Sequence, residues 1–293
     1  MINFKELKIT DKPTYERYLA LYNDKGCEMS FGNLFMWGKQ EIAEVDDHLV
    51  FLATFSKSFY PFPLGVGDKK KVIDTLILDA EERGIEFMLT SITEREKAEL
   101  ERLYPEKFEF STSVDTYDYV YNVDDLAGLI GKKYHKKRNH LNNFKKAHPN
   151  YTVNPVTDAN KEKVVKMVEK WYDGRDESGS LNYEREVFSR AMENFSALEL
   201  EGLALEDNGE VLAVTFASKM NEDTFDVHFE KAIPTVDGAY TAINYEFANY
   251  IKNKYPDVKF LDREEDMGLE GLRKAKQSYY PHHQVVKYRA KLK

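Results

Sequence analysis

The chain has 293 residues, of which 42% are hydrophobic, and its formal net charge is -9. Eighteen Phe and nineteen Tyr supply enough bulky apolar material for one large domain or two of ordinary size, which excludes an intrinsically disordered protein. The single cysteine, Cys27, excludes an internal disulfide framework and indicates a reducing compartment. The apolar runs are far shorter than the roughly 20 residues that span a bilayer, so we expect a cytoplasmic protein without an integral membrane segment.

The first half of the sequence alternates strands and helices. Apolar periodicity predicts strands at 4–9, 41–45, 48–55, 58–65, 86–92, 108–113 and 117–123, and helices at 12–23, 31–38, 68–83 and 93–104. Gly65 and Gly67 stand just before helix 68–83, where free N–H groups could hold a phosphate. The alternative is a plain turn into Asp68 as the N-cap of that helix.

A basic segment separates the two halves. Residues 126–149 carry seven basic and no acidic side chains, and a helix over 132–148 would gather Tyr134, Leu141 and Phe144 in one apolar stripe. Lys137 and Arg138 bracket this stripe, and a cation beside apolar residues needs an anionic partner, in a substrate or a carboxylate. The opposite arc should face solvent, as in a linker helix, or a large anion such as tRNA. It contains Lys132, His135, Lys136, Asn139, Asn143 and Lys146.

The second half repeats the order of elements. Strands are predicted at 151–157, on both sides of Asn208-Gly209, and at 224–230, 258–262 and 283–292, with helices at 161–173, 181–195, 238–254 and 268–280. This alternation predicts an α/β (α+β) protein with mixed sheets. We expect an N-terminal domain at 1–125, a basic inter-domain helix at 126–149 and a C-terminal domain at 150–293.

This order of elements resembles that of the GNAT (N-acetyltransferase) fold, and it occurs once in each half of the chain. The segments GKKYHKKRNHLNNFKK and FLDREEDMGLEGLRKAKQSYYPHH also resemble an uncharacterised bacterial family. That family is related to the C-terminal domain of phosphatidylglycerol lysyltransferases and, more distantly, to Fem-type transferases. The resemblance implies tandem GNAT domains and an acyl or aminoacyl transferase. It also implies an aminoacyl-tRNA donor, with a small molecule, a lipid headgroup or a peptide as acceptor.

Acyl-CoA is the alternative donor. GNAT enzymes that use acetyl-CoA carry a Gly-rich pyrophosphate loop, whereas the matching junction here, EKAIPTVDGAYTA, contains Gly238 alone. We expect no permanently bound cofactor.

Strand 224–230 carries three ionisable side chains, Asp226, His228 and Glu230. Strict alternation would place them on one face, opposite Phe225, Val227 and Phe229. Carboxylates raise the pKa of a neighbouring histidine, and a GNAT base often sits on this strand, so we assign the three as catalytic. A solvated strand face is the alternative. The His-x-Glu spacing does not predict a zinc site, and we expect no metal.

Charged residues follow the next strand at once. Asp262, Arg263 and Glu264 stand at its C-terminal end, where α/β sheets tend to bind ligands. Arg263 could clamp a carboxylate or phosphate, and Asp262 or Glu264 could orient it or bind an ammonium. A charged loop before a helix is the alternative. Tyr279 or Tyr280 could act as a general acid, by analogy with some GNAT enzymes. Lys287 and Arg289 are expected to face solvent.

The leading hypothesis is a tandem-GNAT transferase that moves an acyl or aminoacyl group onto an amine or hydroxyl. We expect a ligand cleft between the halves, with Lys137, Arg138 and Arg263 binding anionic groups and Tyr280 also in contact with substrate. His228 or Glu230 would take the proton. The alternatives are an acyl-CoA-dependent N-acyltransferase and a non-catalytic GNAT-fold module that binds tRNA, a lipid headgroup or a metabolite.

Overall fold

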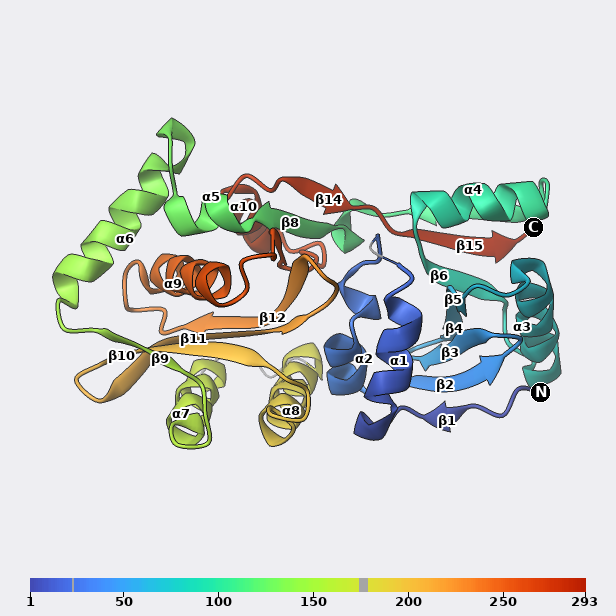
Figure 1. Ribbon diagram of the computed structural model, residues 1–293, viewed down its shortest axis with the longest axis horizontal. Coiled ribbons are helices and arrows are strands. Elements are labelled where there is room, and N and C mark those ends of the chain that lie inside the picture. The colour runs from blue at the N-terminus through green and yellow to red at the C-terminus, as the bar shows by residue number, and fades with distance from the viewer. Residues whose placement is uncertain (23, 174–178) are drawn as a thin grey trace. The chain divides into compact units, whose positions relative to one another are not determined.

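The computed structural model describes residues 1–22, 24–173 and 179–293 (Figure 1). The chain divides into two compact units. The first contains residues 1–118, 265–270 and 284–293, and the second contains residues 119–264 and 271–283. The basic segment 126–149 thus lies within the second unit, and the end of the chain returns to the first. Among the helices of the described residues, none combines the length and the apolar character that a bilayer crossing requires.

Within the described residues, the first unit is built on an eight-stranded sheet. Its strands lie in the order β1 (Lys5–Glu6), β2 (Gln40–Val45), β3 (His48–Thr54), β4 (Ser58–Pro61), β6 (Met88–Ile92), β15 (Tyr288–Leu292) and β7 (Phe108–Thr112), and β5 (Leu64–Gly65) pairs with β3. The helices are α1 (Lys12–Leu19), α2 (Phe31–Trp37), α3 (Lys69–Arg83) and α4 (Glu94–Leu103). Because Val50 packs into the core with α3 while Phe51 meets Tyr15 of α1, β3 is buried on both faces.

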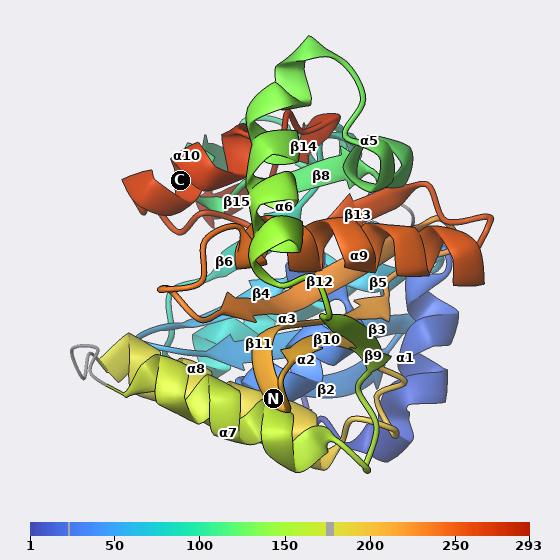
Figure 2. The same ribbon diagram turned by 90° about the vertical axis from the view of Figure 1, so that its left-hand side faces the viewer.

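The second unit has a seven-stranded sheet in its described part. The order is β14 (His283–Val285), β8 (Asp118–Asn122), β13 (Phe260–Asp262), β12 (Thr224–Ala232), β11 (Glu210–Lys219), β10 (Glu201–Asp207) and β9 (Thr152–Pro155). The helices are α5 (Val123–Gly128), α6 (His135–Ala147), α7 (Lys161–Tyr172), α8 (Gly179–Glu193), α9 (Ala239–Lys254) and α10 (Glu270–Gln277). Figure 1 shows α7 and α8 on one face of the sheet and α9 on the other, and Figure 2 shows α6 lying across α9.

The two sheets share one strand order. In each, antiparallel strands lead to a single parallel step, β4 beside β6 in the first and β12 beside β13 in the second. The next strand is antiparallel in both, but it comes from the other half of the chain: β15 joins the first sheet and β8 joins the second. The predictions that 117–123 closes the first sheet and that 283–292 is one strand of the second were therefore wrong. Alternation shows which face of a strand is buried, but it does not identify the neighbouring strand.

Most other predicted elements are confirmed with small shifts at their ends. The hairpin at Asn208-Gly209 has both turn residues at positive φ, 51° and 83°, as a two-residue turn of type I′ requires. Asp46 and Asp47 form a second such turn, at 47° and 58°. The predicted helix 132–148 starts as a 3-10 turn over Lys132–Tyr134 and continues as α6.

Candidate active site

A β-bulge in β12 shapes the candidate active site of the second unit. Opposite β11, Phe216 pairs with Phe229 and Ala217 pairs with Val227, which leaves His228 as the extra residue. A bulged residue stays outside the strand pairing and increases the local twist. The His228 side chain is 2% exposed, whereas the residue as a whole is half-buried, so its accessible part is main chain.

The bulge also reverses the alternation of β12. Val227 lies in the core beneath α9, but Phe229 contacts a phenylalanine of α8, with ring centroids 5.6 Å apart. Asp226 and His228 therefore share one face of the strand, and Glu230 lies on the face covered by α9. The prediction that all three share a face was wrong, because one extra residue moves every later side chain to the opposite side.

The first group in this site, called the arginine cluster, consists of Arg263, Glu230, Lys137 and Tyr279. Arg263 follows β13 and donates from Nη2 to Oε1 of Glu230 at 2.7 Å, and each of the two side chains is 12% exposed. Glu230 also accepts a hydrogen bond from Asn244 of α9 at 3.3 Å. Within the described residues, the buried Nη1 of Arg263 has no hydrogen-bond partner. Glu230 thus holds one edge of the guanidinium and leaves Nη1 for another acceptor.

Tyr279 brings two cations together. The guanidinium carbon of Arg263 lies 4.9 Å from its ring centroid, and Nζ of Lys137 lies 3.6 Å from the same centroid. Tyr279 is buried, which raises the pKa of its hydroxyl. Burial, reinforced by repulsion from Arg263, lowers the pKa of Lys137 to about 8. Two cations therefore face the carboxylate of Glu230, and the surplus positive charge suits an anionic ligand.

The second group, called the carboxylate–histidine cluster, consists of Asp226, His228, Glu264 and Ser218. Oγ of Ser218 lies 2.8 Å from Nε2 of His228. On the other side of the ring, Nδ1 lies 3.4 Å from Oδ2 of Asp226 and 3.5 Å from Oε1 of Glu264. The ligand atoms of Asp226, His228 and Glu264 lie within 4.8 Å of one another, close enough to hold a metal ion. Sequence spacing missed this set because Glu264 comes from the end of a different strand.

The turn after β13 positions both clusters. The buried Asp262 accepts the main-chain N–H of Glu264 at 2.8 Å, and Glu264 has a positive φ of 58°. Lys276 donates to the main-chain oxygens of Arg263 and Glu264. This turn is the ligand-binding stretch that the sequence predicts after strand 258–262. Asp262 supports it, and Glu230, rather than Asp262 or Glu264, is the carboxylate seen to orient Arg263.

Helix α6 has the two surfaces that its periodicity predicts. Tyr134, Leu141 and Phe144 are buried. Lys137 lies at the edge of this buried stripe, against Tyr279. The opposite arc is exposed throughout, and it consists of Lys132, His135, Lys136, Asn139, Asn143 and Lys146.

Arg138, in contrast, binds main chain. Its Nη1 donates to the carbonyl oxygens of Leu129 and Gly131, the latter at 2.7 Å. Leu129 ends α5 with a positive φ of 47°, so Arg138 satisfies carbonyls that a helix end leaves free. The sequence predicts an anionic partner for Arg138 in a substrate or a carboxylate, whereas the partners observed are these main-chain carbonyls.

The tyrosine beside Arg263 is Tyr279, whereas Tyr280 is 47% exposed and packs edge-on against Tyr134 with centroids 5.6 Å apart. Ser218 and Asn244 are site residues that the sequence analysis missed. Each is a common polar residue within an apolar pattern, and no spacing signal connects it to β12 or to the turn after β13.

Local structure explains both glycine-marked junctions, one by a helix cap and the other by close packing of main chain. Asp68 caps α3 by accepting the N–H of Lys71 at 3.1 Å, which confirms the plain N-cap interpretation. A Cβ on Gly238, which has φ of 78°, would lie 2.3 Å from the carbonyl oxygen of His140 on α6. Gly238 therefore allows the start of α9 to approach α6.

The first unit contains a separate buried charge cluster around Lys287. Its Nζ lies 2.7 Å from Asp118, 2.8 Å from Glu28, 3.5 Å from Glu265 and 3.7 Å from the Cys27 thiol. Burial raises the pKa of Asp118 to about 7; Lys287 opposes this rise, and Glu28 and Glu265 reinforce it. The expectation that Lys287 faces solvent was wrong, because this ammonium neutralises a buried acidic group.

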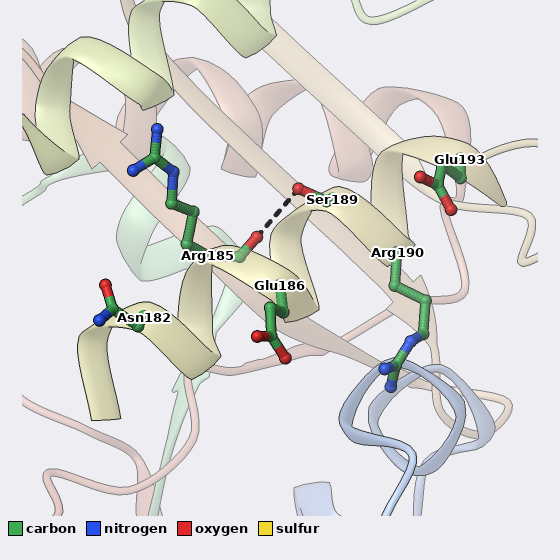
Figure 3. A pocket seen from close by; sticks show the side chains of 6 residues that line it. All are labelled: Asn182, Arg185, Glu186, Ser189, Arg190 and Glu193. Carbon is green, nitrogen blue, oxygen red and sulfur yellow. Dashed lines mark hydrogen bonds between the residues drawn. The ribbon is translucent and has the colours of Figure 1, made fainter. Parts of the chain in front are cut away.

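An open depression lies along α8 (Figure 3). Its lining side chains are Asn182, Arg185, Glu186, Ser189, Arg190 and Glu193. All six come from one helix and are polar or charged, and Ser189 donates to the main-chain oxygen of Arg185 at 3.1 Å. None of these six residues belongs to the arginine cluster or to the carboxylate–histidine cluster.

Comparison with known proteins identifies the family. A family model described as phosphatidylglycerol lysyltransferase, C-terminal, matches residues 19–291. The chain belongs to the phosphatidylglycerol lysyltransferase C-terminal family. A solved structure of a conserved protein of unknown function from Bacteroides thetaiotaomicron is similar to this chain. It is 38% identical in sequence, both chains are covered in full, and the TM-score is 0.93.

Two more distant structures support the fold of the phosphatidylglycerol lysyltransferase C-terminal family. L-PGS from Bacillus licheniformis is 15% identical over 96% of this chain and 92% of its own, with a TM-score of 0.68. A tandem GNAT protein from the clavulanic acid biosynthesis pathway is 9% identical over 99% and 98%, with a TM-score of 0.51. The prediction of an α/β fold with two tandem GNAT-like domains is confirmed.

A curated relative, an uncharacterised protein from Mycoplasmoides gallisepticum, is 24% identical over 179 residues. That match covers 60% of this chain and 56% of the relative, little more than half of the relative's length.

Proposed function

We propose that the chain is an aminoacyl transferase whose active site is formed by the arginine cluster and the carboxylate–histidine cluster. The observation that carries the proposal is the meeting of Arg263 and Lys137 on the ring of Tyr279, with Glu230 as the carboxylate partner. Largely buried cations in excess of the facing carboxylate favour a phosphate or carboxylate group from a substrate.

The proposed acceptor is a lipid headgroup that carries a phosphate and a hydroxyl. The description of the family names phosphatidylglycerol, whose headgroup has both. The phosphate would bind Nη1 of Arg263 and Nζ of Lys137, whose side chains both lie against the ring of Tyr279. Phosphate geometry suits the planar donors of arginine, with lysine adding a point charge.

The proposed donor is an aminoacyl-tRNA. The exposed arc of α6 offers Lys132, Lys136 and Lys146 to a phosphate backbone, and contacts of this kind need no sequence recognition. An acyl-CoA donor has less support, because Gly238, the glycine at the junction where GNAT enzymes hold pyrophosphate, is used in the contact with α6.

The transfer needs donors for the developing oxyanion and a group that takes the proton of the attacking hydroxyl. The main chain of His228 is accessible and lies outside the regular pairing of β12 with β11, so its N–H could serve the oxyanion. Glu230 is already bound to Arg263 and Asn244, which leaves the imidazole of His228 as the proposed proton acceptor.

The test is transfer of radiolabelled amino acid from charged tRNA into lipid that is extracted with organic solvent. We expect label in phosphatidylglycerol vesicles but not in phosphatidylcholine vesicles. The amount of label transferred should be at least tenfold lower with Arg263→Gln. It should be unchanged with Lys57→Glu, the exposed control. Transfer from acyl-CoA with no transfer from any charged tRNA would instead support the N-acyltransferase. Vesicle binding that persists in His228→Asn and Glu230→Gln, without turnover in the wild type, would support the non-catalytic module.

A further inference from the structure

We propose that Asp226, His228 and Glu264 bind a divalent transition-metal ion such as Zn²⁺. The nitrogen and oxygen atoms that surround the site come from three residues, two on β12 and one in the turn after β13. Nδ1 of His228 lies 3.4 Å and 3.5 Å from the two carboxylate oxygens. Ligands about 2.1 Å from zinc in a tetrahedral arrangement lie roughly 3.4 Å from each other. The observed separations match this spacing.

The same separations are too long for hydrogen bonds. A charge-assisted bond between imidazolium and carboxylate is typically about 2.7–2.9 Å. Over the described ranges of the chain, Nδ1 of His228 has no hydrogen-bond partner, although the side chain is almost completely buried. A buried ring nitrogen that has no hydrogen bond and faces two carboxylate oxygens at these distances is suited to hold a metal ion together with them.

Ser218 fixes the ring in the orientation that a metal ligand requires. Its Oγ lies 2.8 Å from Nε2 of His228 and can accept the hydrogen of that nitrogen. In this tautomer, the lone pair of Nδ1 points toward Asp226 and Glu264. Metal-binding histidines usually donate their other ring N–H to such a partner, which sets the tautomer and raises the basicity of the ligand.

The first unit provides an internal contrast. Cys27, Asp118 and Glu265 also present ligand atoms within 4.8 Å of one another. Lys287 supplies the positive charge there, with its ammonium 2.7 Å from Asp118. In the carboxylate–histidine cluster, one of the three ligand atoms is an imidazole nitrogen, which binds a transition metal as a neutral ligand. We therefore expect metal binding in the second unit and not at Cys27.

This site goes beyond the proposed transfer activity and would alter one of its assignments. With a metal bound, His228 is a ligand, so the proton of the attacking hydroxyl would pass to solvent water and not to its imidazole. A metal ion next to the bulge could also polarise the carbonyl of the donor as a Lewis acid. Metal binding is measured without tRNA or lipid, so its failure leaves the transfer test unaffected.

The test is calorimetric titration of the EDTA-treated, dialysed full chain with Zn²⁺. We expect one tight site per chain, at least tenfold weaker in Glu264→Gln and in His228→Asn, and about 10–100-fold weaker in Ser218→Ala. Cys27→Ser is the matched control and should bind as the wild type does. Glu264 is partly exposed, so its substitution should leave the fold intact, which circular dichroism would check.

Co²⁺ substitution gives a second readout. The visible spectrum of a four-coordinate Co²⁺ ion should appear in the wild type and in Cys27→Ser and be lost in Glu264→Gln. Zn²⁺ binding that is equal in the wild type and Glu264→Gln, or that disappears in Cys27→Ser, would overturn the proposal.

Discussion

Arg263 and Glu230 form a largely buried ion pair that joins the turn after β13 to the far end of β12. The two strands pair over Thr224–Asp226, and Glu230 lies beyond this stretch and beyond the bulge. The ion pair thus connects the strands where their main chains no longer pair. It also sets the direction of the guanidinium, whose other edge carries Nη1, an atom without a hydrogen-bond partner in the described part of the chain.

Substitutions of the two partners should have different effects on anion binding. Arg263→Gln removes the donor and should weaken binding of glycerol phosphate at least tenfold, which corresponds to about 1.4 kcal/mol. Glu230→Gln removes the competing carboxylate and should leave this affinity equal or higher. Both variants should lower the free energy of unfolding by about 3 kcal/mol, because each leaves a partner unpaired. Calorimetry and urea denaturation measure the two quantities, and weaker phosphate binding in Glu230→Gln would contradict the assignment.

Anion binding should also depend on the protonation of Lys137. Burial lowers the pKa of Lys137 to about 8, so the ammonium is present below this pH and is lost as the pH rises through it. We expect the affinity for glycerol phosphate to fall between pH 7 and pH 9.5 in the wild type. Lys137→Arg keeps its charge over this range and should bind with little pH dependence. Equal pH profiles for the two proteins would exclude Lys137 from the site.

The exposed arc of α6 should control the salt dependence of tRNA binding. Lys132→Glu with Lys136→Glu removes two contacts to phosphate, and the slope of log affinity against log salt should become less steep by about 1 to 2 units. Lys57→Glu changes an exposed lysine of the first unit and should leave the slope unchanged. Filter binding at several salt concentrations measures the slope. Loss of affinity without a change in slope would mean that the arc does not contact phosphates.

Arg138 should matter for stability and not for ligand binding. Arg138→Ala removes two hydrogen bonds to main-chain carbonyls, and we expect the free energy of unfolding to fall by about 1–2 kcal/mol. Affinity for glycerol phosphate should stay within twofold of the wild type. A variant that keeps its stability but loses phosphate binding would restore the substrate role that the sequence suggested.

Removal of Lys287 should make the stability of the first unit depend on pH. In Lys287→Met, Asp118, Glu28 and Glu265 lose their ammonium, and the loss of a buried partner costs about 3–5 kcal/mol. Without the cation, the pKa of Asp118 should rise further above about 7. The carboxyl then binds a proton more tightly in the folded state, so the loss should be largest at pH 8 and smaller at pH 5. Lys291→Met, at an exposed ion pair, should show no such trend in thermal unfolding.

Sequence periodicity predicted the helices well and the site only in part. The two surfaces of α6 follow from the spacing of Tyr134, Leu141 and Phe144, because a helix repeats every 3.6 residues without help from its neighbours. The turn after β13 was also predicted as a ligand-binding stretch. The relation of Asp226 and His228 to Glu230 was not, because a bulge depends on how β11 and β12 pair and leaves no mark in the alternation of β12 itself.

The sequence by itself determined the order of elements, the burial of one face of α6 and the family, because these depend on local periodicity and on residue identity. Only the tertiary structure decided which sheet received β8 and β15, and which charged groups became partners. Arg263 binds Glu230 from another strand, Arg138 binds the end of α5, and Lys287 is enclosed by carboxylates far away in the chain. Pairings of this kind are set by long-range contacts, and the cost of burying a charge becomes visible only when its surroundings are known.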